Sequence, residues 1–148
     1  MILKEAPNFV LKDQSGKEFE LYKNLDSNVL LVFYPKDSSM VCSKQLADYN
    51  NNQDLFKMNF INLVGINIES SNSHKSFCDK LGLNFPVLSD TDKKVSKNYD
   101  ALTFWGVNKR KLVLINSSKN VVFEKSVFNF RYPSVEEIIN IGKQLIIA

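Results

Sequence analysis

The stretch that decides the fold and the chemistry of this chain is Phe33-Tyr34-Pro35-Lys36-Asp37-Ser38-Ser39-Met40-Val41-Cys42-Ser43-Lys44-Gln45. The apolar run at 29–34 that leads into it is typical of a buried strand, and Leu46, Tyr49 and Phe56 follow Cys42 at helical spacing. A strand therefore ends shortly before a helix whose first turn carries a cysteine. Free N–H groups and the helix dipole favour a thiolate there, which is the reactive form. The competing interpretation makes Cys42 a small buried hydrophobe.

Further β structure is predicted on both sides of this stretch. Short apolar runs at 60–66 and 112–115 indicate two more central strands. The segment 121–124 follows across a polar turn and suits a hairpin with 112–115. Near the start of the chain, 9–11 and 19–21 flank Ser15-Gly16 as an N-terminal hairpin.

Three helices are expected between and after these strands. The first, 42–57, joins two strands into a parallel pair. The second, about 73–81, has His74, Phe77 and Cys78 on one apolar stripe and ends at Gly82. The third begins at the capping box 134–137. These elements predict an α/β, thioredoxin-like fold, with a mixed central sheet flanked by helices on both faces.

Composition limits the function classes. With 44% hydrophobic and 24% charged residues and no repeat or linker, residues 1–148 are expected to form one thioredoxin-like domain. Lys4 and Glu5 interrupt any apolar leader and no long apolar run follows, so a cytoplasmic protein is expected. A disulfide in that compartment would be transient and catalytic rather than structural. A net charge of +3 on scattered residues argues against nucleic-acid binding, and no membrane association is expected.

The loop before the helix matches a known pattern. Pro35, Ser39 and Cys42 form P-x-x-x-[T/S]-x-x-C, which resembles the active-site loop of peroxiredoxins. Phe-Tyr-Pro-Lys-Asp resembles the peroxiredoxin Q group, also called bacterioferritin comigratory protein. Further segments that resemble this group lie at 6–9, 73–77, 82–90 and 110–116. Several such segments in the right order are stronger evidence than one short motif. The resemblance implies a thiol peroxidase that reduces hydrogen peroxide and organic hydroperoxides.

The resemblance also implies roles for individual residues. Cys42 would be the peroxidatic thiol, the Ser39 hydroxyl would hydrogen-bond the thiolate and the peroxide, and Pro35 would shield the site from water. Arg110 falls where the family places a guanidinium beside the sulfur, where it would favour the thiolate and hold the peroxide oxygen. Without the resemblance, Arg110 would be interpreted as a solvated cation at a strand end.

Three more residues have two interpretations each. Gln45 matches the family's Glu or Gln that braces the site, or is an exposed helix residue. Tyr34 packs beside the site, or is simply core. His74, the only histidine, is expected to be structural or exposed rather than a general base.

Cys78 decides the subclass. Some peroxiredoxin Q proteins carry a resolving cysteine five residues after the peroxidatic one, but that position is Ala47 here; Cys78 resembles the type with its resolving cysteine in the following helix. Its place on an apolar stripe also suits an inert thiol. In the resolving role, Cys78 would form a disulfide with the Cys42 sulfenic acid, and thioredoxin would reduce it. The cysteines start on different helices and a disulfide needs Cα atoms within about 7 Å, so both helices are expected to unwind locally.

Other features complete the expectations. No metal or organic cofactor is expected, since two cysteines and one histidine cannot supply a four-ligand zinc site. Val41 stands where the family loop has glycine, and a positive φ there would strain it. A disulfide reductase would need C-x-x-C, which this helix start lacks.

Two alternative functions stay open. One is a non-catalytic peroxide sensor or interaction module, and the other is a one-cysteine peroxidase. A monomer is expected.

Overall fold

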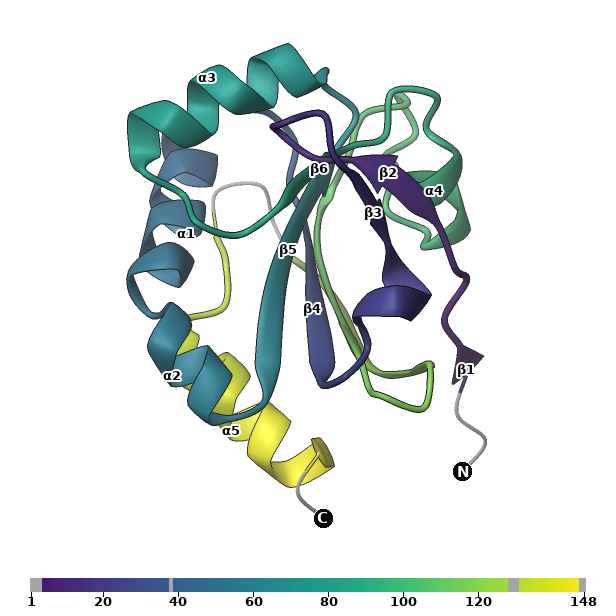
Figure 1. The fold of residues 1–148 in the computed structure, drawn as a ribbon, viewed down its shortest axis with the longest axis vertical. Helices are drawn as coiled ribbons and strands as arrows, with labels where there is room; N and C mark the ends of the chain where they lie inside the picture. Colours follow the sequence, from purple (N-terminus) through teal and green to yellow (C-terminus); the bar gives the residue numbers. More distant parts are fainter. Residues whose placement is uncertain (1–3, 38, 128–130, 147–148) are drawn as a thin grey trace.

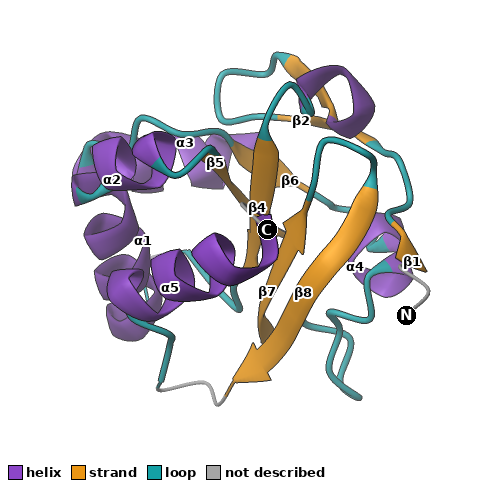
Figure 2. Ribbon diagram, turned by 90° about the horizontal axis from the view of Figure 1, so that it is seen from below, coloured by secondary structure: helices purple, strands orange, loops and turns teal. Residues whose placement is uncertain are grey.

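The computed structural model describes residues 4–37, 39–127 and 131–146. A twisted sheet of eight strands forms its centre, in the order β1-β8-β7-β4-β5-β6-β2-β3 (Figures 1 and 2). Strands β4, β5 and β6 are parallel to one another, and the other neighbours pair antiparallel. The strands are β1 (Lys4–Glu5), β2 (Val10–Lys12), β3 (Glu18–Glu20), β4 (Asn28–Phe33), β5 (Ile61–Asn67), β6 (Val87–Ser89), β7 (Arg110–Ile115) and β8 (Asn120–Val127).

Helices cover both faces of the sheet. Figure 2 shows α1, α2, α3 and α5 on one face and α4 on the other. The helices are α1 (Met40–Asn51), α2 (Gln53–Met58), α3 (Ser71–Leu81), α4 (Lys94–Asn98) and α5 (Val135–Ile146), with a 3-10 turn, η1, at Leu21–Asn24. This is the mixed, helix-flanked sheet with an N-terminal hairpin that the sequence predicts.

The central strand β4 explains why two cores form. Leu30 and Val32 point into the core under α1, α2, α3 and α5. Val29, Leu31 and Phe33 point into the second core, under α4 and the N-terminal segments. Alternate residues of a strand face opposite sides, so an apolar run without alternation is what burial on both faces requires.

The structure corrects the prediction of one helix over 42–57. The helix breaks at Asn52, where φ is −116° and ψ is 20°, and α2 begins at the next residue. The break follows the run Asn50-Asn51-Asn52, whose side chains compete for backbone hydrogen bonds and so disfavour a helix interior. The sequence analysis also missed β1, β6, η1 and α4, which are too short to show a periodic pattern.

The strand directions bring Arg110 and the loop before Cys42 to the same edge of the sheet. The carboxyl ends of the parallel strands β4, β5 and β6 meet there. Strand β7 runs antiparallel to β4, with Lys111 opposite Phe33, so Arg110 at the start of β7 lies beside the end of β4. The segment 34–39, here called the Cys42 loop, leaves β4 at this edge and leads into α1.

The surface carries one apolar pair that the sequence analysis did not single out. Phe104 and Trp105, between α4 and β7, are 94% and 83% exposed, and their rings meet edge to face at 5.3 Å. Among the described residues, no helix has the length and apolar character needed to cross a membrane.

Candidate active site

Helix α1 begins so that Cys42 lies in its first turn. The side chain of Ser39, the N-cap, accepts a hydrogen bond from the Cys42 N–H at 3.1 Å. The Cys42 side chain is fully buried. Met40 and Val41 are already helical, and the non-glycine residues recorded with positive φ lie elsewhere in the described chain, so Val41 is not strained by replacing the family's glycine.

Arg110 places its guanidinium against the sulfur of Cys42. Its Nη2 donates to Cys42 Sγ at 3.3 Å, and the residue is only 1% exposed. The alternative of a solvated strand-end cation is therefore wrong. A buried guanidinium needs an anionic or strongly accepting partner, and a thiolate is the charged form that Cys42 can offer. The contact places a fixed positive charge directly against the sulfur.

A chain of hydrogen bonds fixes the direction of Arg110. Its Nη1 donates to Gln45 Oε1, Gln45 Nε2 donates to the Tyr49 hydroxyl at 3.4 Å, and that hydroxyl donates to the Pro133 carbonyl at 2.7 Å. Gln45 is fully buried, so its interpretation as an exposed residue is wrong. Burial raises the pKa of Tyr49 and keeps it a neutral donor. The sequence showed Tyr49 only as an apolar helix position and gave no signal for this contact.

The Cys42 loop contains two other predicted site residues, Pro35 and Ser39. Pro35 and Ser39 are half-buried. The Ser39 oxygen accepts from the Cys42 backbone, which leaves the hydroxyl hydrogen to donate to another atom.

Cys78 lies on the buried side of α3 as a free thiol. It is 3% exposed and belongs to the same apolar core as Cys42. Burial, with smaller contributions from the negative charges of Asp37, Asp79 and Asp13, raises the pKa of Cys78 from 9.0 to about 12. In this folded state it is therefore a thiol, not a thiolate.

The comparison with known families shows to which family the chain belongs. The model of the AhpC/TSA family matches residues 2–124. The chain belongs to this family. A chloroplastic peroxiredoxin Q of Sedum lineare is 40% identical over 101 residues, which are 68% of this chain and 51% of the relative. The chain spans about half the length of the curated relatives it matches.

Solved peroxiredoxin structures share the fold. The reduced 2-Cys peroxiredoxin of Plasmodium vivax is 27% identical, with a TM-score of 0.88 over 97% of this chain and 94% of that chain. A peroxiredoxin Q of Xanthomonas campestris is 22% identical, with a TM-score of 0.83 over 92% of this chain and 90% of that one. The thioredoxin-like fold and the resemblance to peroxiredoxins are confirmed.

A polar network that the sequence analysis missed is centred on Asp37, in the loop before Cys42. Asp37 is 3% exposed, and its carboxylate lies 2.5 Å from the Tyr34 hydroxyl and 2.7 Å from both Ser73 Oγ and His74 Nδ1. Burial opposes ionisation of Asp37, but the hydrogen bonds from His74, Tyr34 and Ser73 outweigh it and lower the pKa from 3.8 to about 2. His74 is fully buried and serves this network. In the sequence, the only indication of this network was a single histidine on an apolar helix stripe.

Tyr34 turns toward α3 from the end of β4. Its ring stacks on Phe77 at 6.0 Å, and burial with the charge of Asp37 raises its pKa well above the usual value. Tyr34 is thus both core and part of the Asp37 network. Through it, the first residue of the Cys42 loop contacts the helix that carries Cys78.

Glu69 and Ser73 complete the network. Ser73 Oγ lies 2.7 Å from both Asp37 Oδ2 and Glu69 Oε2, although a hydroxyl has one hydrogen to donate. Burial and the nearby Asp37 charge raise the pKa of Glu69. A carboxylic hydrogen on Glu69 would satisfy the second contact.

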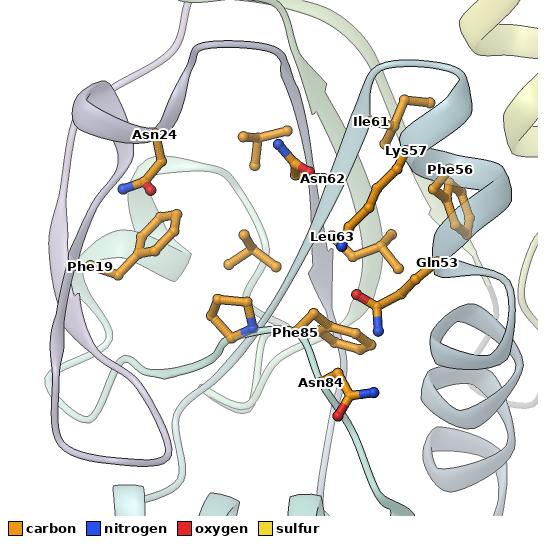
Figure 3. A pocket seen from close by; sticks show the side chains of 13 residues that line it. Phe19, Asn24, Gln53, Phe56, Lys57, Ile61, Asn62, Leu63, Asn84 and Phe85 are labelled. Atoms are coloured by element: carbon orange, nitrogen blue, oxygen red, sulfur yellow. The ribbon is translucent and has the colours of Figure 1, made fainter.

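A separate hollow lies outside the site around Cys42. Figure 3 shows Phe19, Phe56 and Phe85 around it with several amide side chains, between the N-terminal hairpin, α2 and β5. Its lining includes neither Cys42, Arg110 nor Cys78. Its walls are apolar side chains, amides and the amine of Lys57, so it is separate from the site around Cys42.

Metal ligands are not gathered in the described ranges 4–37, 39–127 and 131–146. No group of three His, Cys, Asp or Glu side chains there is placed to hold an ion. The functional groups that the structure brings together are a thiol, a guanidinium and hydrogen-bonding side chains.

Proposed function

We propose that the protein is a thiol peroxidase that reduces hydrogen peroxide and organic hydroperoxides with Cys42. The observation that carries this proposal is the 3.3 Å contact between Arg110 Nη2 and Cys42 Sγ in a buried site. A fixed positive charge beside a cysteine in the first turn of a helix favours the attacking thiolate. Membership of the AhpC/TSA family supports the same chemistry.

In the first step, the Cys42 thiolate attacks the distal oxygen of the hydroperoxide. A sulfur–oxygen bond forms, the oxygen–oxygen bond breaks, and the leaving alkoxide or hydroxide takes a proton to become alcohol or water. Sulfur is oxidised by two electrons and the peroxide is reduced by two. The guanidinium of Arg110 stabilises negative charge that develops on the peroxide oxygens. The hydroxyl of Ser39 can donate to the peroxide, and Pro35 limits the entry of water.

In the second step, Cys78 resolves the sulfenic acid. The Cys78 sulfur bonds to the Cys42 sulfur, and the sulfenic oxygen leaves as water, giving an internal disulfide. Both thiols are buried and lie on different helices, α1 and α3. The step therefore requires the first turn of α1 and the part of α3 around Cys78 to unwind.

An external dithiol must then restore both cysteines. Thioredoxin is the reductant we propose: its thiolate attacks the disulfide to give a mixed disulfide, and its second cysteine releases the reduced protein. The complete cycle needs a hydroperoxide and a dithiol and no metal or organic cofactor.

A one-cysteine peroxidase with an inert Cys78 is the second candidate. The buried, un-ionised state of Cys78 favours it, since the pKa of about 12 makes this thiol a poor nucleophile while α3 stays folded. The two candidates differ in the product that follows the sulfenic acid.

Peroxide consumption coupled to thioredoxin and its reductase tests the proposal with wild type, Cys42→Ser and Cys78→Ser. Wild type should turn over, and Cys42→Ser should lose activity. Full turnover by Cys42→Ser would contradict peroxidase chemistry at Cys42. Thioredoxin-linked turnover by Cys78→Ser, with no internal disulfide in wild type, would establish the one-cysteine enzyme. Oxidation of Cys42 without turnover would support a peroxide sensor.

We further propose a monomer in a reducing compartment such as the cytoplasm. Two free thiols suit a compartment that keeps cysteines reduced. Sedimentation of wild type and of a Phe104→Ser, Trp105→Ser double variant tests the monomer, because exposed apolar pairs are the usual contacts of an interface. A wild-type dimer that the double variant abolishes would contradict it.

A further inference from the structure

Asp37 ties the Cys42 loop to helix α3. Its Oδ1 accepts from the Tyr34 hydroxyl and from Asn67 Nδ2 at 3.3 Å, and its Oδ2 contacts Ser73 and His74. Two of these four partners belong to α3, which also carries Cys78. One buried carboxylate, on the loop that leads to the first cysteine, therefore holds the helix of the second.

His74 faces two acceptors. Its Nδ1 lies 2.7 Å from Asp37 Oδ2, and its Nε2 lies 3.0 Å from the carbonyl oxygen of Leu88 at β6. An ionised carboxylate and a backbone carbonyl can only accept, so a hydrogen on each ring nitrogen would satisfy both contacts. The result is a buried His74–Asp37 pair that joins the Cys42 loop, α3 and β6. Removing one partner of such a pair leaves the other buried and uncompensated, which destabilises the closed arrangement.

His74 and Cys78 lie one turn apart on the same buried face of α3. While the pair is closed, Cys78 stays packed in the core and close enough to Asp37 for the carboxylate charge to oppose its ionisation. Opening the pair removes one of the two Asp37 contacts that hold α3 to the loop and moves this charge away from the thiol. The same event thus makes Cys78 both mobile and more nucleophilic.

We propose that Asp37 and His74 are positioning residues for the resolving step, and that their ion pair must open before Cys78 can reach the Cys42 sulfenic acid. The proposal rests on the proposed function, in which the two cysteines form a disulfide. The closed pair holds the loop for reaction with peroxide, and the open pair permits condensation with loss of water. The ionisable groups that face the pair are Tyr34 from the end of β4, Glu69 after β5 and Cys78 from α3.

Single-turnover kinetics separate the two steps. Reduced protein is mixed with one equivalent of hydrogen peroxide and quenched with an alkylating agent, and intact mass then counts sulfenic acid and disulfide over time. In His74→Gln and in Asp37→Asn, disulfide should form about tenfold faster than in wild type, because an open α3 is more populated. The double variant should be no faster than the faster single variant, since one pair is lost in each.

Two control variants distinguish loss of the Asp37–His74 pair from a change of charge near Cys78 and from weaker core packing. Asp79→Asn removes a carboxylate that also raises the pKa of Cys78 but lies outside the pair. Ile139→Val weakens the same core from α5 without touching the pair. Both should leave the rate of disulfide formation within about twofold of wild type. Equal acceleration by either control, or unchanged rates in both His74→Gln and Asp37→Asn, would overturn the proposal.

A spectroscopic measurement tests the pair directly. The chain has one histidine, so its ring signals in 15N NMR spectra belong to His74. Reduced wild type should show a hydrogen on both ring nitrogens, and oxidised protein should lose this protected pair. A neutral ring in the reduced protein, or a pair that survives disulfide formation, would contradict the account. If wild type forms no disulfide at all, the proposed resolving chemistry itself fails, which this assay distinguishes from failure of the pair.

Discussion

Arg110 lies against Cys42 although 68 residues separate them in the chain. The sheet explains the contact: β7 runs antiparallel to β4, so its first residue meets the edge from which the Cys42 loop departs. Gln45, one turn after Cys42, holds the other side of the guanidinium. The cation is thus fixed before any peroxide arrives, which is the condition for electrostatic stabilisation without reorganisation.

Replacing Arg110 should slow the first step. Arg110→Gln should lower the rate of Cys42 oxidation by hydrogen peroxide by about 10²–10³-fold, the usual cost of losing one preorganised donor. Arg110→Lys should lie between this variant and wild type, since an ammonium cannot hold both Cys42 and Gln45 in a fixed fork. Stopped-flow kinetics measures both rates.

Lys109→Gln is the matched control for Arg110. Lys109 is the preceding cation and forms a long ion pair with Asp100 at the surface, 3.9 Å apart. Its loss should leave Cys42 oxidation within about twofold of wild type, because surface pairs contribute little. Equal slowing by Lys109→Gln and Arg110→Gln would show that net charge, and not the contact, matters.

Much of the site could be predicted from the sequence because local patterns encode it. The apolar run before Tyr34 and the helical spacing after Cys42 predict the strand, loop and helix start. The motif of Pro35, Ser39 and Cys42 predicts the family. Arg110 was placed by resemblance, since nothing local to Lys109-Arg110-Lys111 indicates a buried cation.

The remainder depends on contacts between distant segments. Asp37 and His74 meet because the ends of β4 and β5 lie side by side, and no local pattern encodes that pairing. The break at Asn52 and the short strand β6 were missed for a different reason, because helical spacing continues across the break and three residues are too few to show a period.

Ser39 should contribute to stability as well as to chemistry. Ser39→Ala should cost about 1 kcal/mol of unfolding free energy, because the Cys42 N–H loses its cap, whereas Ser39→Thr should keep most of it. Urea unfolding of the reduced protein measures this. Ser70→Ala, which removes the corresponding cap of α3, should cost a similar free energy without slowing Cys42 oxidation. A Ser39→Ala variant as stable and as fast as wild type would exclude both roles.

Cys78 should resist thiol reagents while the protein is folded. In Cys42→Ser, alkylation of Cys78 should be slow at pH 9.0 and rise only toward the folded pKa of about 12, whereas the urea-unfolded chain should titrate near 9.0. The sign follows from linkage: the raised pKa stabilises the fold at low pH, and this contribution is lost as the pH rises from 9.0 through about 12. Equal alkylation of folded and unfolded protein at pH 9.0 would contradict the buried thiol.

Asp37 should make the fold sensitive to acid. Its pKa is lowered from 3.8 to about 2, so its stabilising contribution is present above pH 3.8 and is lost as the pH falls through about 2. The shift corresponds to about 2 kcal/mol. Urea unfolding measures the free energy of unfolding of wild type and of Asp37→Asn across this range. The difference between the two free energies should shrink as the pH falls. A difference that stays constant down to pH 2 would contradict the ionised carboxylate.

The most direct test of the account is to locate the oxygen that a single equivalent of hydrogen peroxide leaves on reduced Cys78→Ser. Trapping with a sulfenic-acid reagent and peptide mass analysis should place it on Cys42 within seconds. Among the described residues, Met40 and Met58, which are 87% and 76% exposed, are competing targets and should stay unoxidised. Oxygen on these methionines with an unmodified Cys42 would contradict the central claim that this buried thiol is the one that reacts with peroxide.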